Sequence, residues 1–132
     1  MAVLDRPVMK PRPVYLNLFA IRMPLPAIVS ILHRASGALL FLVGIPLMLC
    51  VVQRALASPE AWAQMRVAFD APLAKLVALV LAWAFIHHLL AGIRHVLMDA
   101  HVGIELPAAR RSAALTMVLA VVLTLALAVR LW

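Results

Sequence analysis

The chain has 132 residues, of which 67% are hydrophobic and 13% charged, and its formal net charge is +7. A soluble domain is closer to half apolar and a quarter charged, so this composition excludes an ordinary water-soluble fold. The basic residues do not gather into a stripe on a polar face, and we therefore expect no nucleic-acid partner despite the positive charge.

Several prolines precede or begin the first apolar stretch, and they rule out a continuous helix there. They are Pro7, Pro11, Pro13, Pro24 and Pro26. We therefore expect residues 1–25 to form an extended cytoplasmic segment, with one short turn around residues 15–22. Its apolar side chains favour a position on the membrane surface or under a partner protein.

Three apolar stretches are each long enough to cross a bilayer as a helix, which takes about 20 residues. They run over residues 26–53, 72–98 and 112–132. We therefore expect an all-α integral membrane protein, with three transmembrane helices and a single membrane-anchor domain over residues 1–132.

The first stretch contains three features that bear on helix packing. Pro46 lies inside it and predicts a kink. Gly37 and Gly44 share a face, which permits close approach of either another helix or a flat ring. Cys50 is the only cysteine, so no intrachain disulfide or cysteine-based metal cage can form, and its apolar surroundings predict a small buried side chain.

The remaining segments carry weaker signals. The loop over residues 54–71 is polar enough to lie outside the membrane, and the run that begins at Ser58 indicates a short surface helix. The third apolar stretch is composed mainly of alanine, leucine and valine, so we assign it a packing role only.

The basic residues of the tail and loops are distributed unequally across the membrane in this layout. Six lie on one side, Arg6, Lys10, Arg12, Arg22, Arg110 and Arg111, and three on the other, Arg54, Arg66 and Arg130. Because cytoplasmic segments carry the excess of lysine and arginine, this asymmetry predicts a cytoplasmic amino terminus.

A polar group interrupts the first apolar stretch at Ser30, His33 and Arg34. Ser30 and Arg34 are four residues apart and share a helical face that His33 overlaps. One interpretation is that Arg34 reaches back to the lipid headgroups. The other is a quinone pocket, because quinone carbonyls accept hydrogen bonds and gain negative charge on reduction, which a guanidinium stabilises. Ser30 and Arg34 are therefore candidate quinone contacts.

The second apolar stretch contains the strongest functional signal, because ionisable side chains at membrane depth are costly and mark functional sites. His88, Gly92, His95 and Asp99 follow the spacing of one helical face, and Arg94 lies on the adjacent face. An imidazole at this depth is a natural ligand of haem iron, and Gly92 removes a side chain that would obstruct a porphyrin.

His88 is the preferred axial ligand because it shares the face of Gly92. His87 lies about 100° around the helix and is the competing ligand. The alternative without a cofactor is a histidine hydrogen-bonded to a neighbouring helix. At 1.5 Å of rise per residue, His88 and His95 are about 10 Å apart and cannot hold one iron from opposite sides.

The same rise per residue gives the depths of His33 and His88. His33 lies about 10 Å and His88 about 16 Å from the cytoplasmic ends of their helices. This offset favours His33 and Arg34 near the haem carboxylates, with the second axial ligand on another chain. His95 and Asp99 are one turn apart, which predicts a hydrogen bond between them or a solvated helix end.

Two patterns together resemble the cytochrome b556 membrane anchors of succinate:quinone oxidoreductases (respiratory complex II). The first is Arg12-Pro13-Val14, then Leu18, then Ser30-Ile-Leu-His33-Arg34-Ala-Ser36. The second is His88-x-x-x-Gly92-Ile-Arg94-His95-Val-x-Met98-Asp99. They occur in the family's order, and with the three spans the resemblance covers nearly the whole chain. The family's second pattern ends in a small residue, where this chain has His101.

The resemblance implies a bacterial inner-membrane complex of a flavoprotein, an iron–sulfur subunit and two hydrophobic anchors, bundled around one haem. Electrons from succinate would pass through FAD and iron–sulfur clusters in the partner subunits to ubiquinone. By position, Ser30 and Arg34 would contact ubiquinone and His88 would be one axial ligand of haem b. His33, Arg94 and His95 would lie near the haem propionates or tune the site. This chain alone would not oxidise succinate.

Three competing interpretations remain open on the sequence. A fumarate reductase anchor would run the same chemistry in reverse. A small proton or solute transporter component would use His88, Arg94 and Asp99 as a proton path and would carry no chromophore. A purely structural anchor would use its polar residues only to bind a partner.

Overall fold

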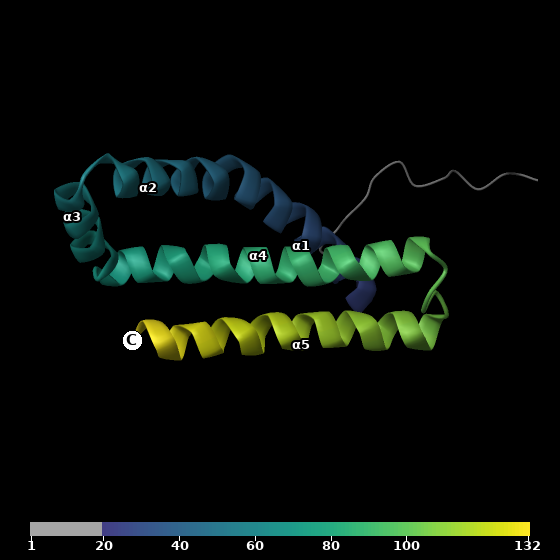
Figure 1. Ribbon diagram of the computed structural model, residues 1–132. Coiled ribbons are helices and arrows are strands. Elements are labelled where there is room, and N and C mark those ends of the chain that lie inside the picture. The colour runs from purple at the N-terminus through teal and green to yellow at the C-terminus, as the bar shows by residue number, and fades with distance from the viewer. Residues whose placement is uncertain (1–19) are drawn as a thin grey trace, which may run out of the picture.

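The computed structural model describes residues 20–132, and every regular element within this range is helical. In chain order they are α1 (Leu25–Leu39), η1 (Leu40–Gly44), α2 (Ile45–Ala57), α3 (Pro59–Phe69), α4 (Pro72–Asp99) and α5 (Leu106–Leu131). Three continuous helices, Leu25–Ala57, Pro72–Asp99 and Leu106–Leu131, are long and apolar enough to cross a membrane. This confirms the predicted all-α architecture with three spans (Figure 1).

The predicted amino-terminal segment falls largely outside the described residues. Residues 20–24 precede the first span without helical structure. The turn expected around residues 15–22 lies mostly outside the range that the structure describes.

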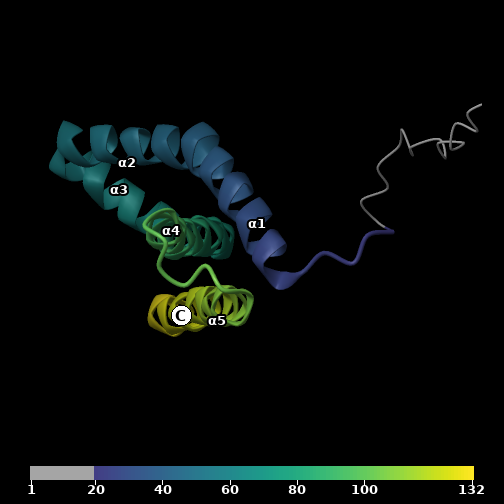
Figure 2. The same ribbon diagram turned by 90° about the vertical axis from the view of Figure 1, so that its right-hand side faces the viewer.

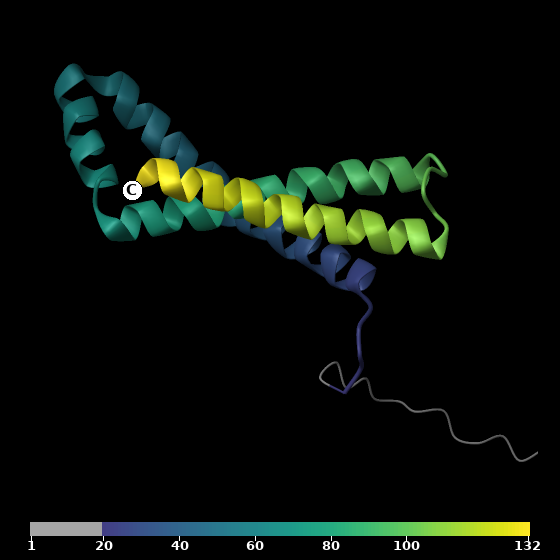
Figure 3. The same cartoon turned by 90° about the horizontal axis from the view of Figure 1, so that it is seen from below.

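Helices α4 and α5 lie side by side and run in opposite directions (Figures 1 and 3). Their contact is built from small side chains. Those that are buried are Ala84 and Ala91 on α4, and Ala109, Ala113, Thr116 and Ala120 on α5. Small residues let helix backbones approach closely where no water is present to drive association. The packing role predicted for the third span agrees with this surface.

The first span bends where the sequence places Pro46. The turn before it, η1, is a π-helix in which the Ile45 N–H donates to the Leu40 carbonyl five residues back. Wider turns of this kind are a recognised cause of helix kinks. Figure 2 shows α1 inclined against α4 and α2 turning away from that line. The predicted kink is therefore present as a π-turn.

The loop between the first two spans contains the expected surface helix, α3. The backbone N–H of Ala61, in the first turn of α3, donates to the Ser58 hydroxyl at 3.1 Å. The pKa of Glu60 lies below its usual range because a backbone N–H and the Ser58 hydroxyl donate to its carboxylate. These contacts stabilise the start of α3.

Two expectations about the spans are corrected. The third span begins at Leu106 rather than at residue 112, because Pro107 is well suited to the first helical turn. Arg110 and Arg111 are therefore exposed in the first turns of α5 and not in a loop. Cys50 is exposed rather than buried, because within residues 20–132 α2 packs against α3 and η1 but not against α4.

The charge distribution between the two ends of the bundle changes slightly. The start of α1 and the turn between α4 and α5 lie toward one end, and α3 and the carboxyl terminus lie at the other (Figure 1). Lys75, in the first turn of α4, adds a fourth basic residue to the end that carries α3. Arg6, Lys10 and Arg12 lie outside the described residues, so the asymmetry of the basic residues and the orientation that follows from it stay predictions.

Helix α4 ends in a Schellman motif. The Val102 N–H donates to the Leu97 carbonyl at 2.9 Å, and the His101 N–H donates to Met98 at 3.0 Å. This motif places the residue after the cap in the left-handed region, where glycine is preferred. His101 has a φ of 62° and occupies that position. This left-handed backbone conformation explains why the family pattern has a small residue at the position of His101.

Replacing His101 with glycine should stabilise the chain by about 1 kcal/mol, because a side chain in left-handed backbone costs about that much. The measurement is the thermal inactivation midpoint of the purified, detergent-solubilised complex. Val102→Gly is the matched control, since Val102 has no positive φ and should give no stabilisation. A lower midpoint for His101→Gly than for wild type would contradict this account of the turn.

Candidate functional site

Three histidines from α1 and α4 form one group. The rings of His33 and His88 stack with centroids 4.2 Å apart and an interplanar angle of 11°. The ring of His95 lies 5.1 Å from that of His33 at an angle of 53°. The structure thus brings together residues from both sequence patterns, with His33 between the two histidines of α4.

Glycines on both helices make room for these rings. A Cβ at Gly37 would lie 2.8 Å from Cε1 of His88, which is closer than real Cβ contacts. A Cβ at Gly92 would lie 3.5 Å from Nε2 of His33, an ordinary van der Waals distance. The sequence singled out Gly92 as the glycine that makes space, but the tighter contact is at Gly37.

The imidazole of His88 is hydrogen-bonded to α1. Its Nδ1 lies 3.0 Å from the carbonyl oxygen of His33 and 3.4 Å from Oγ of Ser36. A carbonyl oxygen can only accept a hydrogen bond, so Nδ1 carries the proton. In the neutral ring this leaves a lone pair on Nε2, which is the form in which histidine binds a metal.

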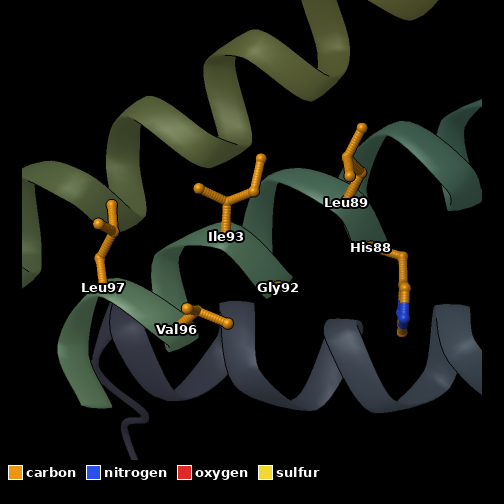
Figure 4. Close-up of a pocket in the computed structure, with 6 residues that line it drawn as sticks. All are labelled: His88, Leu89, Gly92, Ile93, Val96 and Leu97. Atoms are coloured by element: carbon orange, nitrogen blue, oxygen red, sulfur yellow. The ribbon is translucent and has the colours of Figure 1, made fainter. Parts of the chain in front are cut away.

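His88 lines two cavities. The smaller, about 340 Å³, runs along α4 past Gly92 to Leu97 (Figure 4). The larger, about 830 Å³, is bordered mainly by η1, α2 and α4, with Gly37 of α1 and Phe69 of α3, and His88 is the one ionisable side chain among its lining residues. Cofactor sites are concave, mostly apolar and of this size, with few polar groups.

His87 faces the interior of the chain instead. Its side chain is fully buried and its ring stacks on Trp83 at 5.3 Å. Neither ring nitrogen has a hydrogen-bond partner within residues 20–132. His87 therefore belongs to the packed core between the spans, and it does not line either of the two cavities beside His88.

Arg94 joins α4 to α5. Its Nε donates to the Ser112 hydroxyl at 3.0 Å, and its Nη2 donates to the Ala109 carbonyl at 3.2 Å. The side chain is 6% exposed. These bonds direct the guanidinium toward α5, so Arg94 does not join the histidine group directly.

Ser30 and Arg34 lie on the early turns of α1. Ser30 is half-buried and Arg34 is exposed. Among residues 20–132 neither side chain makes a hydrogen bond or ion pair, which leaves both available to a ligand or partner.

The predicted contact between His95 and Asp99 is not formed. In the described part of the chain, no hydrogen bond or ion pair joins these side chains, and Lys75 with Asp70 is the one ion pair. Asp99 is exposed in the last turn of α4. Its placement corresponds to the solvated helix end, the other alternative that the sequence left open.

The ring of His88 stacks on that of His33 and also lies against Gly37, one helical turn further along α1. The predicted offset in depth is therefore compatible with direct contact between the two rings, and α1 crosses α4 obliquely (Figure 3). Two parallel stacked rings cannot hold one iron from opposite faces. No group of three or more histidine, cysteine or acidic side chains that could hold a metal occurs within residues 20–132.

The sequence alone gives Ser36 no role, and it predicts for Gly37 only the close approach of another helix or a flat ring. They follow His33 by three and four residues, which places them on the same face of α1. That spacing is a signal, but it identifies His88 as their partner only when the crossing of α1 and α4 is known.

The fold and the histidine group define a multi-pass membrane protein with a polar site built between its first two spans. Residues 9–127 match the family described as the succinate dehydrogenase/fumarate reductase transmembrane subunit. The chain is 36% identical over 122 residues to the succinate dehydrogenase cytochrome b556 subunit of Coxiella burnetii, covering 92% of this chain and 97% of that protein. It is 37% identical over 101 residues to the subunit of that name from Paracoccus denitrificans, covering 76% and 77% respectively. The chain belongs to this family of transmembrane subunits.

Proposed function

We propose that this chain holds one haem b together with a second anchor subunit and forms part of a ubiquinone-reduction site. The observation that carries the proposal is the state of His88. Its Nδ1 is bonded to the His33 carbonyl, which leaves the Nε2 lone pair free beside two mostly apolar cavities. In this proposal His88 is an axial ligand of the haem iron.

The residues around His88 fit a haem. The cavity of about 830 Å³ is apolar apart from His88 and suits a macrocycle. His33 and His95 supply further imidazoles near His88. These would be the polar partners that the haem propionates need. When bound, the haem supplies reversible one-electron transfer.

Arg94 contributes to the proposed site by a less direct route. Two of its guanidinium nitrogens are bonded to α5, so it fixes the part of α4 that carries His95. The propionate role that the family pattern suggested for Arg94 is supported less directly than that of His33.

The second axial ligand comes from a partner in this proposal. His33 stacks parallel to His88 and His87 is enclosed in the core. Neither can face His88 across an iron, so a second hydrophobic anchor subunit is required. The exposed apolar surface of all three spans leaves room for such a partner and for lipid.

Ser30 and Arg34 form the proposed quinone contacts. The Ser30 hydroxyl would donate to one quinone carbonyl and orient the ring. The Arg34 guanidinium would donate to the same region and stabilise the negative charge that reduction places on the quinone oxygens. Both side chains lack hydrogen-bond partners within the described residues, so a ligand would not have to displace one.

Electrons reach this site from other subunits in the proposed complex. A flavoprotein with FAD would oxidise succinate, and an iron–sulfur subunit would pass electrons to ubiquinone near Ser30. The sequence predicts an excess of basic residues beside the start of α1, which favours a cytoplasmic position for that end in a bacterial cell. This chain then acts as the anchor and has no catalytic head.

A fumarate reductase anchor is the second candidate, and the matching family includes both enzymes. Its chemistry is the reverse reaction, so the test is which of succinate oxidation and fumarate reduction the purified complex performs faster with its native quinone. A transporter component or a purely structural anchor would bind neither haem nor quinone.

Ser30→Ala should slow quinone reduction about tenfold at limiting quinone, because it removes one hydrogen bond to the reacting carbonyl. The measurement is succinate-driven reduction of a short-chain ubiquinone by the purified complex. Ser112→Ala is the control, since Ser112 lies on α5 and accepts a hydrogen bond from Arg94 of α4, not from α1. Equal quinone reduction by Ser30→Ala and wild type would remove Ser30 from the site.

A further inference from the structure

The imidazole of His88 is fixed along the edge that contains Nδ1 and Cε1. The His33 carbonyl accepts from Nδ1–H at 3.0 Å and therefore selects the neutral form in which Nε2 is unprotonated. A hydrogen bond on the second nitrogen of a metal-binding histidine sets ring orientation and raises ligand basicity. Here the acceptor is a backbone atom of α1.

Ser36 supports that carbonyl. Its side chain is buried, and its hydroxyl donates to the His33 carbonyl at 3.0 Å. Because the hydroxyl proton points to the carbonyl, a lone pair of Oγ remains for Nδ1–H of His88 at 3.4 Å. The Nδ1 proton is therefore held between two oxygen atoms of α1.

Gly37 makes space for the same edge of the ring. A Cβ there would lie 2.8 Å from Cε1 and 3.2 Å from Nδ1 of His88. The ring cannot move freely to relieve that contact, because the His33 ring stacks against it at 4.2 Å. A methyl group at position 37 would push the imidazole away from its acceptors.

We infer that Ser36 and Gly37 are positioning residues for His88. They hold its ring with Nδ1 as the proton-bearing nitrogen and Nε2 as the nitrogen that binds iron. The inference rests on the proposed function, in which His88 ligates haem. Residues of α1 would then partly set the reduction potential of the haem. An imidazole whose Nδ1–H is hydrogen-bonded is a more basic ligand than one without that bond, and it favours ferric iron.

A merely structural role for these residues makes a different prediction. If Gly37 only allowed helices to approach, a methyl group there would alter assembly without altering the haem potential. Alanine also has a higher helix propensity than glycine, so the substitution favours the helix itself. Gly37 also lines the larger cavity, so the reduction potential of the haem, rather than the haem content alone, reports the contact with His88.

Gly37→Ala should lower the haem affinity of the assembled complex about tenfold and raise the reduction potential of the haem that remains. Haem content is measured by extraction, and the potential by optical redox titration. Ala38→Val is the control, because it enlarges the next side chain of α1, which is exposed and lines neither cavity beside His88. It should leave both quantities at wild-type values.

Ser36→Ala is the second variant, and it keeps the proposal testable if Gly37→Ala does not assemble. Loss of the hydroxyl leaves Nδ1–H with one acceptor, so haem should be retained at a raised potential, with a smaller shift than for Gly37→Ala. An unchanged or lowered potential in both variants would overturn the inference. Haem retained by His88→Leu, or absent from wild type, would instead refute the proposed function on which the inference rests.

Discussion

Replacing His88 with leucine should abolish haem binding by the assembled complex. Leucine preserves the apolar volume beside the cavities but has no lone pair for iron. His88 is the one histidine that lines either of the two cavities, so His33, His87 and His95 are not placed to replace it. The measurement is extracted haem per complex, with subunit composition checked on a native gel.

His87→Leu is the matched control for that experiment. His87 lies next to His88 on the same helix, but it is enclosed in the core with both ring nitrogens unpaired. Replacing an unpaired buried polar group with an apolar one is neutral or stabilising. His87→Leu should therefore retain the haem and the stability of the complex. Haem lost from His87→Leu and kept by His88→Leu would reverse the assignment of the ligand.

Replacing Arg34 with leucine should reduce the kcat/KM for ubiquinone about 100-fold. Removing one group that stabilises developing negative charge on a reacting oxygen typically has an effect of that order. Arg34 is exposed and unpaired in the described chain, so its loss should cost little stability. The measurement is succinate:ubiquinone reductase activity as a function of quinone concentration.

Two controls separate quinone chemistry from assembly. Reduction of a soluble artificial acceptor by the flavoprotein head should be unchanged in Arg34→Leu, because that reaction does not need the anchor. Arg110→Leu removes another exposed arginine from the same end of the bundle and should retain quinone reduction. A wild-type kcat/KM in Arg34→Leu would instead support the interpretation in which this arginine only contacts lipid headgroups.

The spans could be predicted from the sequence because membrane crossing depends on length and apolar composition. The helix α4 was expected over residues 72–98 and runs from Pro72 to Asp99. The start of α5 was placed too late, because Arg110 and Arg111 suggested a loop although a helix can carry both on exposed positions. Cys50 was expected to be buried because composition does not reveal that α2 leaves the bundle.

Contacts between helices were harder to predict than the helices themselves. Spacing grouped His88 with Gly92 and His95, since these positions repeat within one helix. It could not show that His33 stacks on His88, that Gly37 is the tighter contact, or that Arg94 bonds to Ser112. Each of these contacts depends on how α1 crosses α4 or on which face α5 turns toward α4. The residue spacing within one helix gives no information about either.

The visible difference spectrum of the intact purified complex, reduced minus oxidised, tests the central claim most directly. We expect the bands of a low-spin b-type haem, because His88 and a ligand from a partner anchor would together fill both axial positions. A correctly assembled complex that is colourless in this range, with only its flavin and iron–sulfur signals, would contradict a haem site at His88.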